Sequence, residues 1–279
     1  MKKDEVQTIL EAHGIRPLPS LSQNFLLHEP TRDRIAEAGH TEDVAHVVEI
    51  GGGIGVLTEA LVRRFQRVTV FEIDKTLSQI LRERFYHTPH VVLKEEDALE
   101  ADEYFSGLQD PYVVIANIPY HLTNRIIRSV LTGVPQPQSI VLLVQKEVAE
   151  RLTSDSADYS LFRLSVEMYA HAEYVETVPK AYFYPRPDVD SAVISITPHE
   201  TFADANQEAV LELAGYAFRQ KRKQVRTSLN KQTPMKRENI EHALSACEIP
   251  VDARPQDITP AGWCCIQNQL IYPEARELQ

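Results

Sequence analysis

The fold is decided by Glu49-Ile50-Gly51-Gly52-Gly53-Ile54-Gly55, a stretch that begins inside an apolar run covering residues 45–50 and ends in glycines. The run predicts a buried strand, because short apolar segments bounded by turn residues are typical of buried strands. The glycines allow a sharp turn and let the backbone approach a ligand closely. Residues 56–65 are amphipathic and predict a helix, whose N-terminus would lie behind that ligand.

The same alternation of strands and helices continues along the chain. Residues 77–85 predict a helix, and apolar or β-branched runs predict strands at residues 67–73, 90–94, 112–116 and 139–145. Short apolar strands separated by helices indicate a mostly parallel sheet that is covered on both faces. Such a sheet binds ligands at the carboxyl ends of its strands. The sequence therefore predicts a Rossmann-like α/β fold with a ligand at the glycine-rich loop.

The pattern changes in the second half of the chain. Residues 165–174 and 190–197 alternate like late antiparallel strands, with a proline-rich loop between them. From Asn206 onward the apolar residues follow only helical spacing. We therefore expect an α/β catalytic domain at residues 1–200 and a small all-α domain at residues 201–279.

The composition gives no sign of a membrane segment or a metal site. The sequence has no run of about eighteen apolar residues, and its first five residues, Met1-Lys2-Lys3-Asp4-Glu5, are mostly charged. The chain is therefore expected to be cytoplasmic. The three cysteines, Cys247, Cys264 and Cys265, lack the CxxC spacing of zinc sites and are expected to be free thiols.

The formal net charge of −11 argues against a nucleic-acid partner, because binding phosphates requires positive potential. The charge is unevenly distributed, however, and every charged side chain within residues 219–237 is basic. A local basic segment on an acidic protein is compatible with RNA binding, and a solvated helix face is an equal alternative. The basic residues of this segment are Arg219, Lys221, Arg222, Lys223, Arg226, Lys231, Lys236 and Arg237.

Acidic residues follow the next two predicted strands. Glu72 ends the second strand and could accept hydrogen bonds from both hydroxyls of a ribose. Asp97 follows the third strand and could bind the adenine amine of the same ligand. The glycine loop reads GxGxG, whereas dinucleotide sites read GxGxxG, so the series favours S-adenosylmethionine over NAD or FAD. Taken singly, the glycines could form a structural turn and each acid could be a surface residue.

The fourth predicted strand runs into Asn117-Ile118-Pro119-Tyr120. The exocyclic amine of adenine is a poor nucleophile, and acceptors aimed at its N–H groups would stabilise the charge that develops during methylation. The Asn117 side-chain oxygen and the Ile118 carbonyl could be these acceptors, with Pro119 fixing the turn. Tyr120 offers a ring on which the base could stack. An ordinary strand-to-turn exit is the alternative for this motif alone.

Six ordered motifs resemble those of the KsgA/Dim-type ribosomal RNA adenine N6,N6-dimethyltransferases and their macrolide-resistance (Erm) relatives, and the resemblance covers nearly the whole chain. They are SQNFL at residues 22–26, EIGGGIG at 49–55, EEDAL at 95–99, NIPY at 117–120, FYPRPDVDS at 183–191, and FRQKRK at 218–223 with Ser228-Leu229. The family loop usually has proline at the place of Gly52, so a slightly looser loop without loss of binding is expected here.

The resemblance implies a class I S-adenosylmethionine-dependent methyltransferase fold with a mostly parallel seven-stranded sheet and a helical C-terminal domain that binds RNA. It also implies that Phe183 and Tyr120 form an aromatic clamp on the target base. Together with the glycine loop it gives as cofactor-binding residues Asn24, Leu26, Gly51, Gly53, Gly55, Glu72, Asp97 and Asn117. The RNA-binding residues are expected to be Arg219, Lys221, Arg222, Lys223 and Arg226.

Three functions remain open at this point. The leading hypothesis is a dimethyltransferase that acts on adenines near the 3′ end of small-subunit (16S-type) ribosomal RNA during ribosome biogenesis, with the immature small ribosomal subunit as partner. An Erm-type methyltransferase of large-subunit ribosomal RNA, which gives macrolide resistance, shares the same catalytic motifs. A non-catalytic RNA-binding assembly factor on the same fold is the third. A monomer is expected, because the sequence shows no long exposed apolar stripe.

Overall fold

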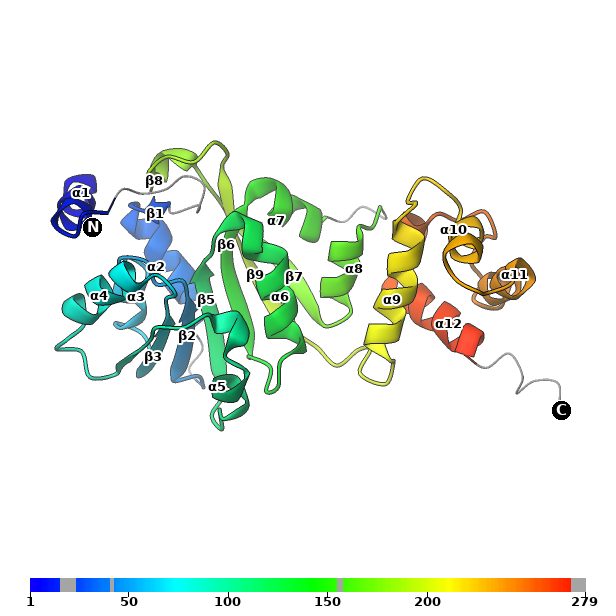
Figure 1. Ribbon diagram of the computed structural model, residues 1–279, viewed down its shortest axis with the longest axis horizontal. Coiled ribbons are helices and arrows are strands. Elements are labelled where there is room, and N and C mark those ends of the chain that lie inside the picture. The colour runs from blue at the N-terminus through cyan, green and yellow to red at the C-terminus, as the bar shows by residue number, and fades with distance from the viewer. Residues whose placement is uncertain (16–23, 41–42, 155–157, 272–279) are drawn as a thin grey trace. The chain divides into compact units, whose positions relative to one another are not determined.

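The computed structural model describes residues 1–15, 24–40, 43–154 and 158–271 (Figure 1). The chain forms two compact units. The first contains Met1–Thr153 and Ala172–Pro198, and the second contains Ser154–His171 and His199–Gln279. Each unit has a hydrophobic core of its own.

The first unit is built on a seven-stranded sheet. In spatial order the strands are β4 (Val91–Lys94), β3 (Arg67–Phe71), β2 (His46–Ile50), β5 (Tyr112–Asn117), β6 (Ser139–Gln145), β9 (Ser191–Pro198) and β7 (Ala170–Val178). The pairings from β4 through to β6 are parallel, and β9 pairs antiparallel with β6. This mostly parallel sheet confirms the Rossmann-like α/β fold that the sequence predicts.

The chain changes direction across the sheet at β2, because β3 and β4 lie on one side of this strand and β5 lies on the other. Such a reversal is a topological switch point, where the loops after neighbouring strands diverge and leave a crevice. All residues of β2 and all but the last of β5 are buried, as expected for strands that are covered on both faces. The crevice therefore lies at the carboxyl ends of two rigid strands.

The helices of the first unit are α1 (Lys3–Ala12), α2 (Glu29–Ala38), α3 (Thr58–Leu61), α4 (Lys75–Arg84), α5 (Asp102–Ser106), α6 (Thr123–Thr132) and α7 (Lys146–Leu152). Asp74 caps α4, because its carboxylate accepts hydrogen bonds from the backbone N–H groups of Thr76 and Leu77. Two short strands, β1 (Phe25–Leu26) and β8 (Phe183–Tyr184), pair antiparallel in a second sheet. This pairing brings the first and the fifth of the sequence motifs together.

Apolar clusters among the described residues hold this unit together. The larger cluster joins Ile35 of α2 and Leu61 of α3 to buried strand residues such as Val47 and Ile115. The smaller cluster joins α1, through Val6 and Leu10, to Phe25, Ile54 and Leu77. Because Ile54 belongs to the glycine-rich loop, the smaller cluster packs directly against this loop.

The predicted helix at residues 56–65 is shorter than expected. Around α3, bonds between residues three apart, such as Arg64 N to Leu61 O, occur together with bonds between residues four apart, such as Phe65 N to Leu61 O. The flanking residues therefore form helical turns outside the regular helix, and amphipathic spacing does not reveal where the regular helix ends. Short 3₁₀ helices in the described part of this unit lie at Ala98–Glu100, Tyr120–Leu122 and Lys180–Tyr182.

The described part of the second unit contains α8 (Leu161–Glu167), α9 (Gln207–Phe218), α10 (Val225–Gln232), α11 (Arg237–Ala246), a 3₁₀ helix at Pro255–Asp257 and α12 (Pro260–Ile271). Figure 1 shows α9 to α12, coloured yellow to red, gathered in one bundle. Fully buried Trp263 lies in its core with Val210, Leu229 and Leu244. None of the helices in the described ranges is long and apolar enough to cross a membrane.

The strand predicted at residues 165–174 is wrong in its first part, where the chain is helical. Ser160 caps α8 by accepting a hydrogen bond from Arg163 N, and Leu164 and Met168 contribute to the core of the second unit one helical turn apart. The strand β7 begins only at Ala170, from which burial alternates. Residues 154–171 thus belong to the second unit, whereas the sequence placed them in the α/β domain.

Two cysteines of the second unit form a disulfide, so the expectation of three free thiols is wrong. Cys247 follows α11 and Cys265 lies in α12, with their Cα atoms 5.9 Å apart. The contact depends on how the two helices pack, which the spacing of cysteines in the sequence does not reveal. Cys264 is a free, buried thiol.

Candidate active site

A pocket of about 360 Å³ opens in the first unit at the carboxyl ends of β2, β3 and β5. This volume lies within the range of about 300–1,000 Å³ that is typical of small-molecule sites. Residues 49–53 and 71–74 form two parts of the wall, and Asn117, Phe25 and Leu26 form others. The pocket therefore occupies the switch point of the sheet.

The glycine loop brings its backbone to the pocket in conformations that favour glycine. Gly51 and Gly53 have φ angles of +78° and +57°, in the left-handed region. Gly53 N donates a 2.8 Å hydrogen bond to the carboxylate of Glu72, and a Cβ atom on Gly53 would lie 3.3 Å from the ring of Phe25. A side chain at Gly53 would therefore both strain the loop and press on the wall of the pocket.

Two other glycines of the loop serve packing. Gly55 is absent from the pocket wall, and a Cβ atom there would lie 2.6 Å from the ring of Phe85. Gly55 therefore packs against the C-terminal end of α4, and the prediction that it contacts the cofactor stays a prediction. A Cβ atom on Gly52 would lie 2.4 Å from Val70 Cγ1, so this position is closely packed and the expected looser loop is not observed.

Glu72 is anchored by the backbone at the edge of the pocket. Its Oε1 accepts a hydrogen bond from Asp74 N at 2.9 Å, and its Oε2 accepts the one from Gly53 N. Burial raises the pKa of Glu72, and these two donors act in the opposite direction. The carboxylate is thus held in one orientation with acceptor positions left for ligand hydroxyls.

Glu49 is a site residue that the sequence-based site prediction left out. It is the penultimate residue of β2, lines the pocket and is 1% exposed, and Thr58 Oγ1 donates a 2.6 Å hydrogen bond to its Oε2. Burial, with a smaller contribution from the charge of Glu72, raises the pKa of Glu49 to about 8. Its position near the end of the strand, two residues before the first glycine, was the sequence signal that could have identified it as a site residue.

Asp97 lines the pocket from the 3₁₀ helix that follows β4. Its Oδ1 accepts a 2.9 Å hydrogen bond from Leu99 N, so the backbone fixes this carboxylate as well. Ile73, between the two acidic positions 72 and 74, is 67% exposed although it is apolar. Together these residues give an apolar surface with carboxylates beside it, which suits a nucleoside.

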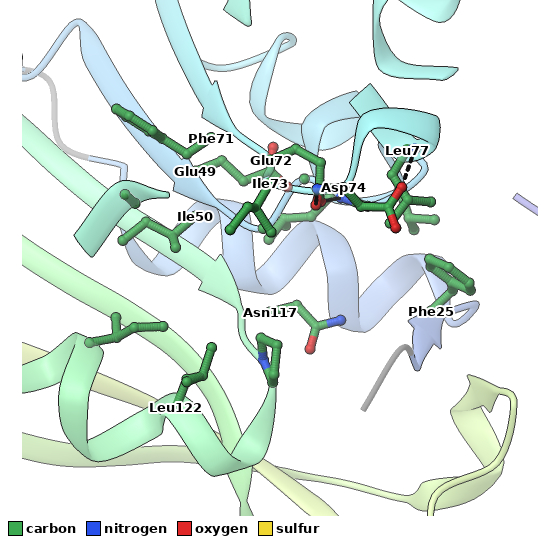
Figure 2. Close-up of a pocket in the computed structure, with 18 of the residues that line it drawn as sticks. Phe25, Glu49, Ile50, Phe71, Glu72, Ile73, Asp74, Leu77, Asn117 and Leu122 are labelled. Carbon is green, nitrogen blue, oxygen red and sulfur yellow. Dashed lines mark hydrogen bonds between the residues drawn. The ribbon is translucent and has the colours of Figure 1, made fainter. Parts of the chain in front are cut away.

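Asn117 is oriented by a backbone contact at the end of β5. Its Nδ2 donates a 3.1 Å hydrogen bond to the carbonyl oxygen of Asn24, and none of the described residues donates to its Oδ1. Figure 2 shows the side chain projecting beyond the strand, with Glu72, Ile73 and Asp74 across the pocket. Its carbonyl oxygen is therefore available as an acceptor, with Pro119 on the same wall.

The other predicted catalytic residues lie beside the pocket wall. Ile118 is buried, and Tyr120 opens the 3₁₀ helix with its hydroxyl 2.7 Å from Ser191 Oγ. Phe183 is 4% exposed, pairs with Leu26 in the β1–β8 sheet and packs in the main core. The structure does not place Phe183 on the pocket wall, so its role in a clamp with Tyr120 stays a prediction.

The sequence-based prediction did not include several residues of the pocket wall. Part of one predicted motif also lies outside the described residues. Arg32 and Ile35 of α2 line the pocket, as do His121, Leu122 and Ile126 after the NIPY motif. Their positions depend on how α2 and α6 pack, which no local pattern reports. Ser22 and Gln23 of the SQNFL motif lie outside the described residues. Within the described ranges no group of side chains is suited to hold a metal ion.

The predicted RNA-binding residues lie in the second unit. Arg219, Lys221, Arg222 and Lys223 are exposed in the turn between α9 and α10. Arg226 differs from them, because its guanidinium forms a 2.8 Å ion pair with Glu241 of α11. Its guanidinium is therefore engaged within the protein, by a carboxylate that also pairs with Arg237, and the four residues of the turn form the stronger candidate surface for phosphates.

Comparison with known proteins gives this geometry a context. A family model described as "Ribosomal RNA adenine dimethylase" matches residues 16–270. The "Ribosomal RNA small subunit methyltransferase A" of Anoxybacillus flavithermus is 36% identical over 278 residues, which cover 95% of this chain and 94% of the relative. The protein of the same name from Dehalococcoides mccartyi is 30% identical over 262 residues, covering 93% and 90%.

Solved structures share the same architecture. The "23S rRNA methyltransferase ErmE" is 27% identical with a TM-score of 0.69, and the match covers 88% of this chain and 99% of that one. A "dimethyladenosine transferase from Plasmodium falciparum" is 24% identical with a TM-score of 0.74, covering 87% and 95%. These likenesses identify the α/β unit as a class I methyltransferase fold, as the sequence predicts.

Proposed function

From the premise that the chain belongs to the ribosomal RNA adenine dimethylase family, we propose that it converts adenines near the 3′ end of small-subunit ribosomal RNA to N6,N6-dimethyladenosine. The names of the bacterial relatives support the choice of subunit. The observation that carries the proposal is the contact of Asn117 Nδ2 with Asn24 O, which leaves an oriented acceptor at the pocket. The immature small subunit is the proposed partner.

We propose S-adenosylmethionine as the methyl donor, and the pocket residues fit it. Glu72 can accept hydrogen bonds from the ribose hydroxyls, and Asp97 can accept one from the adenine amine. The exposed side chain of Ile73 gives an apolar face for the adenine ring. A Cβ atom on Gly53 would lie 3.3 Å from the ring of Phe25, so glycine at this position keeps the space between the loop and that ring open for a ligand.

The protein's contribution to the reaction is orientation and charge stabilisation. The donor supplies a methyl group on a sulfonium, which is already a strong electrophile, so no covalent nucleophile from the protein is required. Asn117 Oδ1 accepts a hydrogen bond from the N6–H of the target adenine and thereby stabilises the positive charge that develops on nitrogen. The carbonyl of Ile118 is the proposed second acceptor, and the ring of Tyr120 is the proposed stacking surface.

The surroundings of this motif keep its geometry fixed. Tyr120 is held by the contact between its hydroxyl and Ser191, and Thr123 Oγ1 donates to the carbonyl of Tyr120 at 2.9 Å. The side chain of Ile118 is buried and anchors the turn in the protein interior. Acceptors that need no rearrangement during the reaction stabilise the transition state more effectively than mobile ones.

The experiment that tests this function supplies the protein with labelled S-adenosylmethionine and small subunits from cells that lack the modification. Labelled adenines at the 3′ end of the small-subunit RNA, found by mapping the modified bases, are the expected result. The variant Asn117→Ala serves as the inactive control. Label on no adenine of the subunit would overturn the proposal.

The resistance-type function is the second candidate, because ErmE matches the fold over 99% of its own length. The same assay with large subunits distinguishes the two functions, since label would then appear on large-subunit adenines. Expression in a sensitive host would also raise macrolide survival. A protein that binds S-adenosylmethionine weakly and labels neither subunit would instead fit the non-catalytic assembly factor.

We further propose that the protein works as a monomer in the cytoplasm, where ribosomal subunits are assembled. The described part of the chain shows no helix that could cross a membrane, and the proposed substrate is a ribosomal particle. Light scattering at micromolar concentration tests the oligomeric state. A mass of about twice 31.7 kDa would contradict the proposed monomer.

A further inference from the structure

Arg32 places a guanidinium where a helix normally buries apolar side chains. It lies on the same face of α2 as Ile35 and Ala36, and it is 3% exposed. Burying a charge in this way is costly unless the charge is paired and its donors are satisfied. Arg32 also lines the pocket, so its position concerns the ligand as well as the fold.

Among the described residues, only some of the N–H groups of this guanidinium have hydrogen-bond partners. The Nε and Nη2 atoms donate to Asp33 Oδ1 at 3.1 and 3.0 Å. The Nη1 atom has no hydrogen-bond partner among the described residues, and Glu59 Oε1 lies 3.7 Å from it. Two N–H donors on Nη1 are therefore left for another acceptor.

The acids near Arg32 are shared with other cations. Asp33 also accepts a hydrogen bond from Arg63 at 3.0 Å, and Glu59 forms ion pairs with Arg63 and Arg84 at 3.6 and 3.3 Å. Three guanidinium groups thus share two carboxylates. This group of side chains has a surplus of positive charge, which favours an anion beside it.

The other charged side chains of the pocket have the opposite sign. Among the described residues of its wall, Arg32 is the one arginine or lysine, whereas the acids are Glu49, Glu72, Asp74, Glu96 and Asp97. S-adenosylmethionine carries a single anionic group, the carboxylate of its amino-acid part. The purine and ribose find acceptors at the acidic edge formed by β3 and β4, so the carboxylate is left for α2.

We propose that the guanidinium of Arg32 binds the α-carboxylate of the methyl donor, with Nη1 as its hydrogen-bond donor. This inference rests on the proposed use of S-adenosylmethionine. A charge-assisted pair between arginine and a carboxylate is strong in a partly dry site, because few water molecules compete with it. Arg32 is then a determinant of specificity for ligands that carry the amino-acid part.

The test compares two ligands that differ in this part. S-adenosylhomocysteine has the amino-acid chain, and 5′-methylthioadenosine has a methyl group in its place. Calorimetric titration of the Arg32→Met variant is expected to show a loss of about ten- to a hundredfold in affinity for S-adenosylhomocysteine, the loss typical of one charged hydrogen bond. Affinity for 5′-methylthioadenosine is expected to change by no more than about twofold, which also shows that the variant folds.

Two further variants make the result specific. Arg63→Met removes a guanidinium that shares the same two carboxylates but lies outside the pocket wall, and it is expected to leave both affinities unchanged. Arg32→Lys keeps the charge and is expected to restore part of the affinity for S-adenosylhomocysteine. This pattern would support a direct contact.

Two results would overturn the inference in different ways. An equal effect of Arg32→Met on both ligands, or none on either, would show that Arg32 has only a structural role, while the proposed donor would stand. Failure of the unmodified protein to bind S-adenosylhomocysteine would overturn the proposed donor and the role of Arg32 with it.

Discussion

Asn117 and Glu49 illustrate how single residues acquire their function from the backbone around them. Asn117 is an ordinary amide whose usefulness comes from one contact, to Asn24 O, that decides which of its two ends faces the ligand. Glu49 is an ordinary carboxylic acid whose proton affinity is changed by burial. The sequence identifies the first through the NIPY motif, but the consequence for the second appears only once its surroundings are known.

The Asn117→Ala variant tests the acceptor role at this scale. We expect methyl transfer to fall by about a hundredfold or more, because the lost acceptor acts mainly on the developing charge. The affinity for S-adenosylhomocysteine should change by less than about threefold. Turnover is measured with labelled donor, and affinity by calorimetry.

The matched control for this variant is Tyr120→Phe, which removes a hydroxyl that contacts Ser191 and keeps the ring. It should retain most of the activity, whereas Tyr120→Ala should lose base capture. Equal losses of turnover and donor affinity in Asn117→Ala would contradict the assigned role.

The raised pKa of Glu49 predicts a pH-dependent stability. In the unfolded chain this carboxyl loses its proton near its ordinary pKa of about 4.3, whereas in the folded protein it retains the proton up to about pH 8. Between these pH values the folded state binds more protons, so stability falls as the pH rises. In the absence of ligand, Glu49→Gln should therefore gain in Tm relative to the unmodified protein from about pH 5 to about pH 8, and the difference should then level off.

Thermal denaturation across this pH range checks the expectation. The glutamine retains an oxygen that can accept the hydrogen bond from Thr58, so the substitution removes the titrating group and little else. The same substitution at exposed Glu100 is the control and should show no such trend. A constant difference between Glu49→Gln and the unmodified protein would argue against a buried, protonated Glu49.

At the scale of the element, the glycine-rich loop packs tightly without the proline that the family usually has. The side chains of Val70 and Leu81 fill the space above Gly52. Gly52→Ala should therefore destabilise the first unit by about 1–3 kcal/mol, the usual cost of overpacking. Adding Val70→Ala should recover part of this loss, so that the double variant loses less than the sum of the single changes.

Gly215→Ala is the control for this prediction, because a Cβ atom there would meet nothing within 4 Å. Gly215 lies inside α9, where alanine is the better helix former, so stability should rise slightly. Additive effects of Gly52→Ala and Val70→Ala in denaturant titrations would show that the two side chains do not collide.

Elements with a strong local signature were predictable, and those defined by long-range packing were not. The five parallel strands follow from short apolar runs, and the pocket follows from the glycines and acids at their ends. Residues 165–167 misled the prediction, because Leu164 and Met168 serve the core of a different unit. Gly55, Arg32 and the Cys247–Cys265 disulfide depend on neighbours that are distant in the sequence.

At the scale of the whole molecule, the exposed cations of the turn between α9 and α10 belong to the second unit and the pocket belongs to the first. Substitutions in this turn should therefore weaken RNA binding selectively. Replacing Lys221, Arg222 and Lys223 with alanine should weaken binding to small subunits and lower the slope of log affinity against log salt by about one per cation that contacts a phosphate. The affinity for S-adenosylhomocysteine should stay unchanged, because all described residues of the pocket wall belong to the first unit. Binding is measured at several salt concentrations.

Arg226→Ala is the control, because it removes one positive charge of the same segment that is already paired with Glu241. It should lower the stability of the second unit more than the affinity for RNA. An equal loss of RNA affinity in both variants would mean that the ion pair opens when RNA binds.

The described residues of the pocket wall all lie between Asn24 and Ile126 in the sequence. The four exposed cations belong to a later stretch with a separate core. If these cations bind RNA as expected, mutations in the helical unit could change which particle is recognised without changing the proposed donor site. A chimera that joins the first unit to the helical unit of a relative should then retain donor affinity and take its preference for RNA from the new partner. The target could in this way diverge while the chemistry stays the same.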